Sequence, residues 1–249
     1  MIDIQNINAI DYVSNLDTSS IDLIIIDPPY LTTKQHWDQT EQVNSQLVEQ
    51  LWRVAKDSCS IYVWCGIGEK SQSLIRWFPV FNDVFYFKDL ITWKKQRGIG
   101  MRKGWLYTRE ELMWFVKNNK KFVWNKEHQY SQEKRVWTAH YANKERREKY
   151  LKNLSPFKRI TNVWSDVREA NIAWNRQDKR KFHFTPKPTK AIKRIIESHT
   201  SPGDNVLDCF LGSGTTAFCC KELDRNFYGC DANKEYIMMI TNYLDSFIL

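Results

Sequence analysis

The chain has 249 residues, of which 42% are hydrophobic and 27% charged, enough to bury the core of one large α/β domain or of one domain with an inserted lobe. No apolar run is long enough to span a membrane and no basic-then-apolar signal pattern opens the chain, so we expect a cytoplasmic protein that is not bound to a membrane. The net charge of +8 combines +15 over residues 94–181, where 24 Lys and Arg stand against 9 Asp and Glu, with −7 over the remainder, a segregation typical of polyanion binding.

The first predicted elements lead to a proline-containing tetrapeptide. Residues 1–12 predict a short strand and a turn, and Ile21–Ile26 is a branched apolar run typical of a strand buried on both faces of a parallel sheet. Asp27-Pro28-Pro29-Tyr30 follows directly. The prolines cannot donate to a sheet ladder, and a residue before proline is held extended, so Asp27 is presented rigidly at the carboxyl end of the strand. Open α/β sheets bind ligands at that edge.

The tetrapeptide offers the groups that would hold an exocyclic amino group of a nucleobase. Asp27 and a nearby backbone carbonyl supply fixed acceptors, and the Tyr30 ring supplies a face for stacking. Acceptors on both N–H bonds favour a more pyramidal nitrogen whose lone pair can attack, while stacking holds the base in line. The alternative interpretation is a plain strand-to-turn junction, in which Asp and Pro are common.

The next segments alternate between helical and strand patterns. A polar loop over Leu31–Thr40 carries Trp37 and is long enough to close over a bound base. Helical spacing over residues 43–54 is followed by a strand-like run at Ser60–Cys65. Another helix is predicted around residues 74–78, and a further strand at Val84–Trp93.

The composition changes at Lys94. Residues 94–104 are basic and punctuated by glycine, which predicts a mobile loop facing a phosphate backbone. Leu112–Val116 and Phe122–Trp124 resemble a hairpin, which would suit an antiparallel edge of the sheet. From His128 to Lys181 basic residues are interleaved with aromatic ones without a regular period. This pattern favours nucleic-acid binding, and a small lobe with an aromatic core is the alternative.

Regular α/β order resumes at His183. An apolar helical stripe ends at His199, which is therefore interpreted as a helix-end residue rather than a catalyst. Strand-like runs at Asn205–Cys209 and Asn226–Cys230 flank a glycine-containing loop and a helix, and residues 236–247 predict an amphipathic helix.

The six cysteines show no CxxC and no Cys/His spacing of the kind that binds metals. Several of them fall in strand-like apolar runs. We therefore expect buried thiols in a reducing compartment, and no metal site.

The late loop predicts a nucleoside cofactor. Gly212 and Gly214 allow a tight turn and a close approach of the backbone to a ligand. Asp231 lies 19 residues after Gly212, at the end of the next strand, where it can accept both hydroxyls of a ribose. The third glycine of a dinucleotide fingerprint is absent, which argues against NAD. S-adenosylmethionine lacks a pyrophosphate, and its sulfonium methyl is the electrophile that the Asp27 site needs; a structural turn is the alternative.

The order of these motifs resembles that of the β-class of DNA amino-methyltransferases, with the Asp27 tetrapeptide early, a basic variable region in the middle and Phe210-x-Gly-x-Gly late. Residues 162–166 and 203–208 look like the segments that flank the cofactor motif of that family. His183-Phe184-Thr185-Pro186-Lys187-Pro188 is similar to its H-P-T-Q-K-P element, with Phe and Pro in place of Pro and Gln. Cys209 stands where the family commonly has proline.

The resemblance implies methyl transfer from S-adenosylmethionine to a base flipped out of double-stranded DNA, and Asp at the first tetrapeptide position implies N6 of adenine. Asp27, Pro28, Pro29 and Tyr30 are the expected catalytic residues, with Asp27 and the Pro28 carbonyl on the amino group. The expected cofactor-binding residues are Asn8, Ala9, Lys187, Asp208, Phe210, Gly212, Ser213, Gly214, Thr215, Thr216 and Asp231. The expected DNA-binding residues are Trp37, Lys94, Lys95, Arg97, Arg102 and Lys103.

The expected fold is a Rossmann-like, doubly wound and mostly parallel α/β sheet with an antiparallel edge hairpin. Residues 1–93 would form the catalytic part, 94–181 the hairpin and a basic target-recognition region, and 182–249 the cofactor-binding part of the same domain. The resemblance also names a homodimer and a cognate restriction endonuclease as partners to test. The alternatives are methylation of N4 of cytosine, of RNA or of a protein amide, and a catalytically inactive nucleic-acid-binding relative.

Overall fold

The computed structural model describes residues 1–32, 43–68, 71–99, 103–134, 145, 148, 155–169 and 186–246, and of residues 97, 99 and 246 the backbone alone. Its main sheet has eight strands in the order β1-β10-β9-β2-β3-β5-β4-β8. These strands are β1 (Ile2–Gln5), β2 (Ile21–Ile26), β3 (Ala55–Cys65), β4 (Tyr86–Ile99), β5 (Tyr107–Val116), β8 (Val163–Trp164), β9 (Asn205–Asp208) and β10 (Asn226–Cys230).

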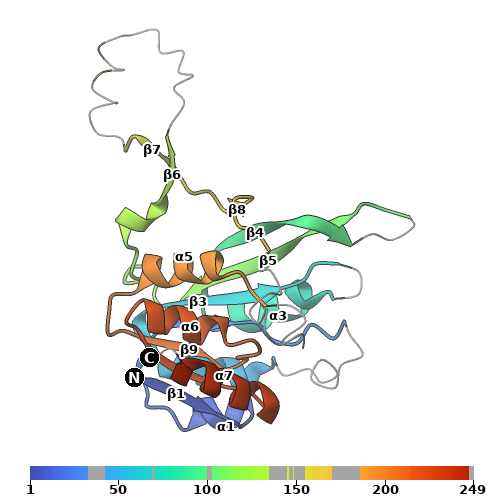
Figure 1. Cartoon of the computed structure of the whole chain (residues 1–249), viewed down its shortest axis with the longest axis vertical. Coiled ribbons are helices and arrows are strands. Elements are labelled where there is room, and N and C mark those ends of the chain that lie inside the picture. Colours follow the sequence, from blue (N-terminus) through green and yellow to red (C-terminus); the bar gives the residue numbers. More distant parts are fainter. Residues whose placement is uncertain are drawn as a thin grey trace.

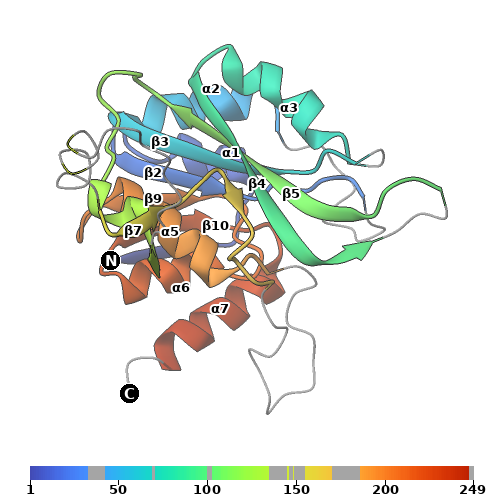
Figure 2. The same cartoon turned by 90° about the horizontal axis from the view of Figure 1, so that it is seen from above.

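The main sheet is mostly parallel and carries helices on both faces. β1, β10, β9, β2 and β3 pair in parallel, whereas β5 is antiparallel to both β3 and β4. The helices are α1 (Ala9–Ser14), α2 (Ser45–Val54), α3 (Ser73–Asn82), α5 (Thr189–His199), α6 (Thr215–Glu222) and α7 (Lys234–Ser246). The first three cover one face and the last three the other (Figures 1 and 2). This arrangement confirms the predicted doubly wound α/β fold. Within the described residues, no helix is long and apolar enough to cross a membrane.

β2 is buried on both faces of the sheet, as its apolar run predicts. Ile24 and Ile26 belong to the hydrophobic cluster under α1, α2 and α3, and Leu23 and Ile25 to the cluster under α5, α6 and α7. All four side chains are at most 1% exposed, and burying a side chain of this kind stabilises a fold by about 1.5–3 kcal/mol. β2 is therefore a rigid base for whatever follows it.

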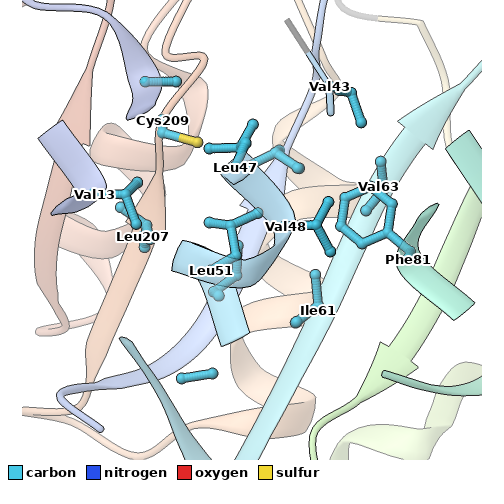
Figure 3. Close-up of a cluster of buried hydrophobic side chains, with 14 of the residues drawn as sticks. Val13, Val43, Leu47, Val48, Leu51, Ile61, Val63, Phe81, Leu207 and Cys209 are labelled. Carbon is cyan, nitrogen blue, oxygen red and sulfur yellow. The ribbon is translucent and has the colours of Figure 1, made fainter. Parts of the chain in front are cut away.

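Figure 3 shows how the cluster on the first face is assembled. Leu47, Val48 and Leu51 of α2 lie over Ile61 and Val63 of β3, and all five are fully buried. The spacing of the apolar residues in α2 places them on one side of the helix. This packing holds the helix that follows the Asp27 segment against the sheet.

The two predicted motifs leave the sheet side by side. β2, which leads to Asp27, pairs in parallel with β9, which leads to the glycine loop, and Ile24 lies opposite Leu207. The sheet continues from β2 to β3 on one side of this pair, and from β9 to β10 on the other side. The order in which the strands are added therefore reverses between β2 and β9. Such a switch point is where doubly wound sheets bind ligands.

The antiparallel hairpin is made of other residues than the sequence predicts. β4 and β5 form it, and they extend past the body of the protein as an arm (Figure 2). The predicted pairing of Leu112–Val116 with Phe122–Trp124 is wrong, because the first run pairs with β3 and β4 on its two sides and the second is not in a strand. The predicted loop at residues 94–104 is wrong over residues 94–99, which belong to β4.

A smaller sheet stands apart from the main one. β6 (Tyr130–Lys134) and β7 (Phe157–Arg159) pair in antiparallel fashion above the body of the protein (Figure 1), and the 3₁₀ helix η2 (Lys126–Gln129) precedes them. β8 instead joins the main sheet beside β4, where Trp164 is buried with the Arg194 guanidinium 5.0 Å from its ring. Most of the other basic and aromatic residues between His128 and Lys181 lie outside the described residues.

All six cysteines are free and buried, which confirms the prediction of buried thiols. Burial raises the pKa of the Cys219 thiol to about 12, with the Lys193 charge opposing the rise. Such thiols are protonated and unreactive at neutral pH.

His199 is the last residue of α5 and lies in a buried aromatic cluster. Its Nδ1 lies 2.7 Å from the Val123 carbonyl oxygen, and its Nε2 lies 2.7 Å from the Tyr62 hydroxyl. Because a carbonyl only accepts, Nδ1–H donates to Val123 and Nε2 accepts from Tyr62. Burial lowers the pKa of His199 to about 4, although the Val123 bond opposes this. The neutral ring is a structural group, as the helix-end interpretation predicts.

We expect the free energy of unfolding to fall by up to about 3 kcal/mol as the pH falls from 6.5 to 4, because His199 takes up a proton in the unfolded chain. Over this window the unfolded chain binds a proton at His199 and the folded chain does not, so the full contribution is present only above pH 6.5. Urea unfolding of the wild type and of His199→Gln, near neutral pH and at about pH 4.5, measures the effect.

The comparison with His199→Gln is needed because Asp208 acts in the opposite direction. Burial raises the pKa of Asp208 to about 7, so its contribution to stability falls as the pH rises from 3.8 toward 7. The difference between the two proteins removes this shared effect. The same pH dependence in both proteins would contradict the neutral, buried state of His199.

Candidate active site

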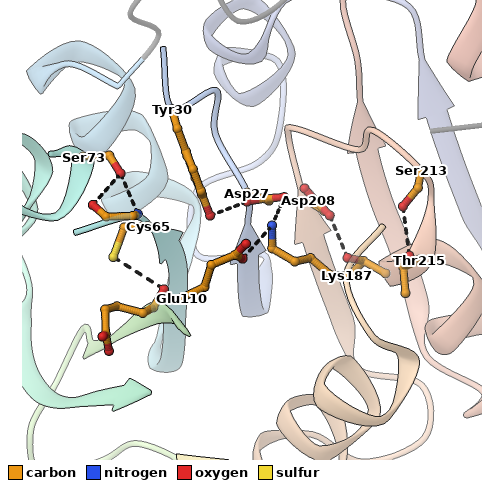
Figure 4. Close-up of polar contacts among 12 residues, drawn as sticks. Asp27, Tyr30, Cys65, Ser73, Glu110, Lys187, Asp208, Ser213 and Thr215 are labelled. Atoms are coloured by element: carbon orange, nitrogen blue, oxygen red, sulfur yellow. Dashed lines mark hydrogen bonds and ion pairs between the residues drawn. The ribbon is translucent and has the colours of Figure 1, made fainter. Parts of the chain in front are cut away.

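The predicted catalytic tetrapeptide lies at the carboxyl end of β2. Pro28 and Pro29 are buried, and Asp27 and Tyr30 are half-buried with their side chains turned toward each other (Figure 4). The Tyr30 hydroxyl donates to Asp27 Oδ1 at 2.9 Å. Leu31 follows with φ 61°, in the left-handed region that is strained for a leucine. Asp27 is therefore held between a buried strand and a strained turn.

The Tyr30 ring is fixed by its neighbours. It packs edge to face on Trp77 of α3, with the ring centroids 5.9 Å apart, and Lys187 Nζ lies 5.5 Å from its centroid. Burial raises the pKa of Tyr30 well above its ordinary value, and the negative charges of Asp27 and Glu110 add to the rise. The hydroxyl therefore stays protonated and keeps donating to Asp27.

Lys187 reaches this cluster from the segment that precedes α5. Its Nζ donates to Asp27 Oδ2 at 2.5 Å and lies 3.4 Å from Glu110 Oε2. Burial lowers the pKa of Lys187, but the charges of Asp27 and Glu110 outweigh burial and raise it above its ordinary value. The sequence places Lys187 at the cofactor, whereas the structure brings its ammonium group onto the predicted catalytic aspartate (Figure 4).

Glu110 of β5 completes the cluster and is absent from the sequence-based predictions. Its carboxylate pairs with Lys187 and with Lys95 of β4. Burial raises the pKa of Glu110, but the charges of Lys187 and Lys95 outweigh burial and lower it. The available signal was a pair of consecutive acids, Glu110 and Glu111, in a strand that continues as an apolar run. Since neighbouring side chains of a strand point to opposite faces, one acid had to face each side of the sheet.

The glycine loop joins β9 to α6. Gly212 and Gly214 have φ of 50° and 76°, a region that glycine adopts readily. A Cβ at position 214 would lie 2.8 Å from Cγ1 of Ile240 in α7, so the loop backbone packs directly on that helix. The Ser213 and Thr215 hydroxyls are 2.9 Å apart at the start of α6 (Figure 4). The start of α6 is therefore fixed against α7, and Gly212 and Ser213 are the half-buried residues of the turn.

Asp208 braces the glycine loop from the end of β9. Its Oδ1 accepts from the Phe210 N–H at 3.0 Å, and its Oδ2 accepts from the Thr216 hydroxyl at 2.7 Å. Burial is the main cause of its raised pKa of about 7; the two hydrogen bonds oppose the rise, and the charges of Asp27 and Asp231 add to it.

Asp231 follows β10 and ties the loop to the next strand. Its Oδ2 accepts from the Gly212 N–H and its Oδ1 from the Asn233 N–H, both at 2.8 Å, and burial raises its pKa. Each oxygen keeps a second acceptor position, so a ribose hydroxyl can be added. Asn6 donates to the Asp231 carbonyl at 2.9 Å, and Asn8 then caps α1 through the Asp11 N–H. The N-terminal loop with Asn8 and the buried Ala9 thus reaches the same edge of the sheet.

The predicted DNA-binding residues differ in their surroundings. Lys94 and Lys103 are exposed, on β4 and just before β5. Lys95 instead turns inward to Glu110, with its ammonium 5.2 Å from the Trp93 ring centroid. Trp37 and Arg102 lie outside the described residues, as does the side chain of Arg97.

The residues at this edge of the sheet fit a nucleoside cofactor. The missing Cβ at Gly214 lets the loop pack on Ile240 of α7, while Gly212 stays half-buried in the turn after β9. Asp231 presents acceptors at the end of the neighbouring strand, and Asp27 lies across the β9–β2 boundary. A cofactor bound along the glycine loop would therefore lie next to the Asp27 tetrapeptide.

Comparison with known proteins agrees with this geometry, since the family model described as DNA methylase matches residues 21–242. The chain belongs to the DNA methylase family. This DNA methylase is 35% identical to the type II methyltransferase M.HpaI of Haemophilus parainfluenzae, over 96% of its own length and 73% of that protein. It is 32% identical to the type II methyltransferase M1.MboII of Moraxella bovis, over 94% and 93% of the two chains. The crystal structure of the M1.HpyAVI–SAM complex shares its fold, with a TM-score of 0.63 and 23% identity over 98% of this chain and 100% of that one.

The DNA methylase is an enzyme that transfers a methyl group from S-adenosylmethionine to an amino group in DNA, as the motif order predicts. The family match spans both the Asp27 tetrapeptide and the glycine loop. The roles of individual residues remain predictions from the sequence and from the contacts described above.

Proposed function

We propose that the enzyme methylates N6 of adenine in double-stranded DNA and that Asp27 and Tyr30 hold the target base. The observation that carries this proposal is the hydrogen-bonded Asp27–Tyr30 pair at the end of β2, next to the glycine loop that follows β9. Asp at the first position of the tetrapeptide, where the resemblance favours adenine, supports adenine over cytosine.

Asp27 accepts a hydrogen bond from the amino group of the base. Its two oxygens now accept one bond each, from Tyr30 and Lys187, and a carboxylate offers about four acceptor positions. The Pro28 carbonyl is the second acceptor, so the nitrogen lone pair points to the cofactor. S-adenosylmethionine supplies an electrophilic methyl group. The amino nitrogen bonds to the methyl carbon, the C–S electron pair returns to sulfur, and the nitrogen loses a proton that Asp27 is placed to receive.

The base must leave the duplex before Asp27 can reach it, because a paired amino group is enclosed in the helix. Tyr30, held by Trp77, supplies a ring on which the base stacks. Residues 94–181 form the basic recognition region in this proposal, between the catalytic part at 1–93 and the cofactor-binding part at 182–249. Exposed Lys94 on the β4–β5 arm is suited to a phosphate contact.

The cofactor lies along the glycine loop in this proposal. The backbone from Phe210 to Thr216 wraps it, Asp231 accepts from its ribose, and Asn8 and Ala9 lie beside its adenine. The backbone geometry at Gly214 and the bond from Gly212 to Asp231 support this placement. We also propose a cytoplasmic enzyme that forms a homodimer and accompanies a cognate restriction endonuclease; light scattering tests the dimer.

Tritiated methyl transfer from S-adenosylmethionine to unmethylated duplex DNA, with RNA as the parallel substrate, tests the proposed function. We expect labelled DNA, and N6-methyladenine as the modified nucleoside when the product is digested and analysed by mass spectrometry. N4-methylcytosine would overturn the choice of base, and labelling of RNA alone would overturn the choice of nucleic acid. If neither DNA nor RNA is labelled, the protein is a catalytically inactive relative and the proposed function is wrong.

A further inference from the structure

We propose that Lys187 is a positioning residue for methyl transfer, an ammonium ion shared between Asp27 and Glu110 that orients the Asp27 carboxylate and balances its charge. This inference rests on the proposed role of Asp27 as the acceptor for the amino group. It assigns Lys187 to the base-holding group instead of the cofactor, and it gives Glu110 of β5 a part in the reaction.

The first observation is the asymmetry of the shared contact. Lys187 Nζ is 2.5 Å from Asp27 Oδ2 and 3.4 Å from Glu110 Oε2. Glu110 Oε2 is buried and has no hydrogen-bond partner among the residues that the structure describes. A buried acceptor without a hydrogen bond is costly, so this oxygen is an available partner for the same ammonium group. A shift of less than 1 Å toward Glu110, about the difference between a hydrogen bond and a loose ion pair, would complete that bond.

The second observation is the alternation of charge across four chain segments. Asp27 after β2, Lys187 before α5, Glu110 in β5 and Lys95 in β4 form a continuous series of opposite charges. The series is neutral as a whole. Removing any one member leaves a net charge in a buried place, which few sites tolerate.

The other titratable groups that face this series do not supply a further cation that could pair with Asp27. Burial raises the pKa of Tyr30 and of Cys65, so both are neutral at pH 7. Asp208 lies on the side of β9, and Glu111 is paired with Arg109 and with Thr92. Among the described residues around Asp27, the charge that balances its carboxylate is therefore that of Lys187.

The chemistry of the transfer explains why a shared ion suits this place. As the amino nitrogen bonds to the methyl group it becomes positive, and the Asp27 carboxylate must attract it. A cation fixed permanently on Asp27 would weaken that attraction. Because Glu110 also attracts Lys187, the ammonium can orient Asp27 before the reaction and yield to the developing charge during it. Preorganised charge of this kind is a large source of catalysis.

A merely structural role is a weaker explanation. Buried ion pairs and triads are often no more stable than hydrophobic residues of similar size, so stability alone does not favour one. Figure 4 shows Lys187 between Glu110 and Asp27, the group that would hold the reacting nitrogen. Its location is what the proposed positioning role requires.

The test uses Lys187→Met, Glu110→Gln and the double variant, with Lys190→Met as the matched control. Lys190 lies in α5, which begins just after Lys187, and makes an exposed ion pair with Asp166. For each protein, the pH profile of turnover at saturating unmethylated duplex DNA is measured, together with the affinity for S-adenosylmethionine and the thermal unfolding curve.

We expect Lys187→Met to lower turnover at least about tenfold and to move the acid limb of the profile upward, since the carboxylates of Asp27 and Glu110 then lie near each other without the ammonium group that separates them. Adding Glu110→Gln should move the limb back toward the wild type, because the net charge is balanced again. Glu110→Gln alone should lower turnover severalfold. The affinity for S-adenosylmethionine should stay within about threefold in all variants, and Lys190→Met should resemble the wild type.

Several results would overturn the inference. A wild-type pH profile in Lys187→Met, or a shift that Glu110→Gln does not reverse, leaves Lys187 a structural residue. A loss of cofactor affinity with unchanged turnover at saturation returns it to the cofactor site. If Lys187→Met does not fold, the isosteric Glu110→Gln decides, and wild-type turnover in that variant rejects the shared ion. Absence of transfer by the wild type would instead reject the proposed function.

Discussion

Asp27→Ala is expected to abolish methyl transfer, with a fall in turnover of at least about 100- to 1,000-fold, while the affinity for S-adenosylmethionine changes little. The alanine removes the acceptor for the amino group and leaves the glycine loop intact, since Asp208 and Asp231 brace that loop from other strands. Lys187 and Lys95 then share the Glu110 carboxylate, so each ammonium group keeps a partner and the cluster carries one net positive charge. Single-turnover transfer to duplex DNA and calorimetric titration with the cofactor measure the two quantities.

Two further variants make the result specific to the position of Asp27. Asp27→Asn keeps an acceptor oxygen but loses the charge, so it should retain more turnover than Asp27→Ala. Asp22 begins the same strand and pairs with Lys56 at 2.7 Å, away from the site. Asp22→Ala should therefore lower stability and leave turnover unchanged. Near-wild-type turnover in Asp27→Ala, or an equal loss in Asp22→Ala, would remove the proposed role.

The sequence predicted the centre of the fold and its two motifs because both depend on local signals. The apolar run of β2, the prolines after it and the strand-glycine-helix order around Gly212 are each complete within about ten residues. Their adjacency follows from the rule that ligands bind where the strand order of a doubly wound sheet reverses. The pairing of Ile24 with Leu207 realises that rule.

The hairpin was predicted in the wrong place because the second half of β4 does not show the alternation of apolar and polar residues that is typical of a strand. Lys94 is exposed on β4 and Lys95 pairs with Glu110 of β5, so this part of the strand lacks the apolar alternation by which a strand is recognised. Leu112–Val116 was recognised as a strand, but its partners are set by the whole sheet and not by the nearest apolar run.

The charge cluster could not be derived from the sequence because its members are far apart along the chain. Glu110 of β5 and Lys187 of the segment before α5 are brought together only in the folded protein. Nothing near either residue indicates the other. Burying a charge is costly unless an oppositely charged group lies beside it, and this cost arises only in the folded protein.

Gly214→Ala is expected to reduce the affinity for S-adenosylmethionine at least about tenfold and to lower the free energy of unfolding by about 1–3 kcal/mol. The backbone at 214 has φ 76°, and the new Cβ would lie 2.8 Å from Ile240 Cγ1 and 3.0 Å from its Cγ2. Ile240 is fully buried and branched at Cβ, so it has little freedom to turn away. The loop backbone must move instead, and that backbone is the proposed cofactor surface.

Gly203→Ala separates the strain of the backbone from the clash with α7. Gly203 has φ 89° in the turn before β9, and a Cβ there would meet nothing within 4 Å. Gly203→Ala should therefore lower stability by about 1 kcal/mol without changing cofactor affinity. Ile240→Ala removes the side chain that a Cβ at position 214 would meet and leaves the backbone strain. Gly214→Ala should therefore lower the free energy of unfolding by less in the Ile240→Ala protein than in the wild type. Equal losses of affinity in the two glycine variants would show that cofactor binding does not depend on where the loop backbone rests against α7.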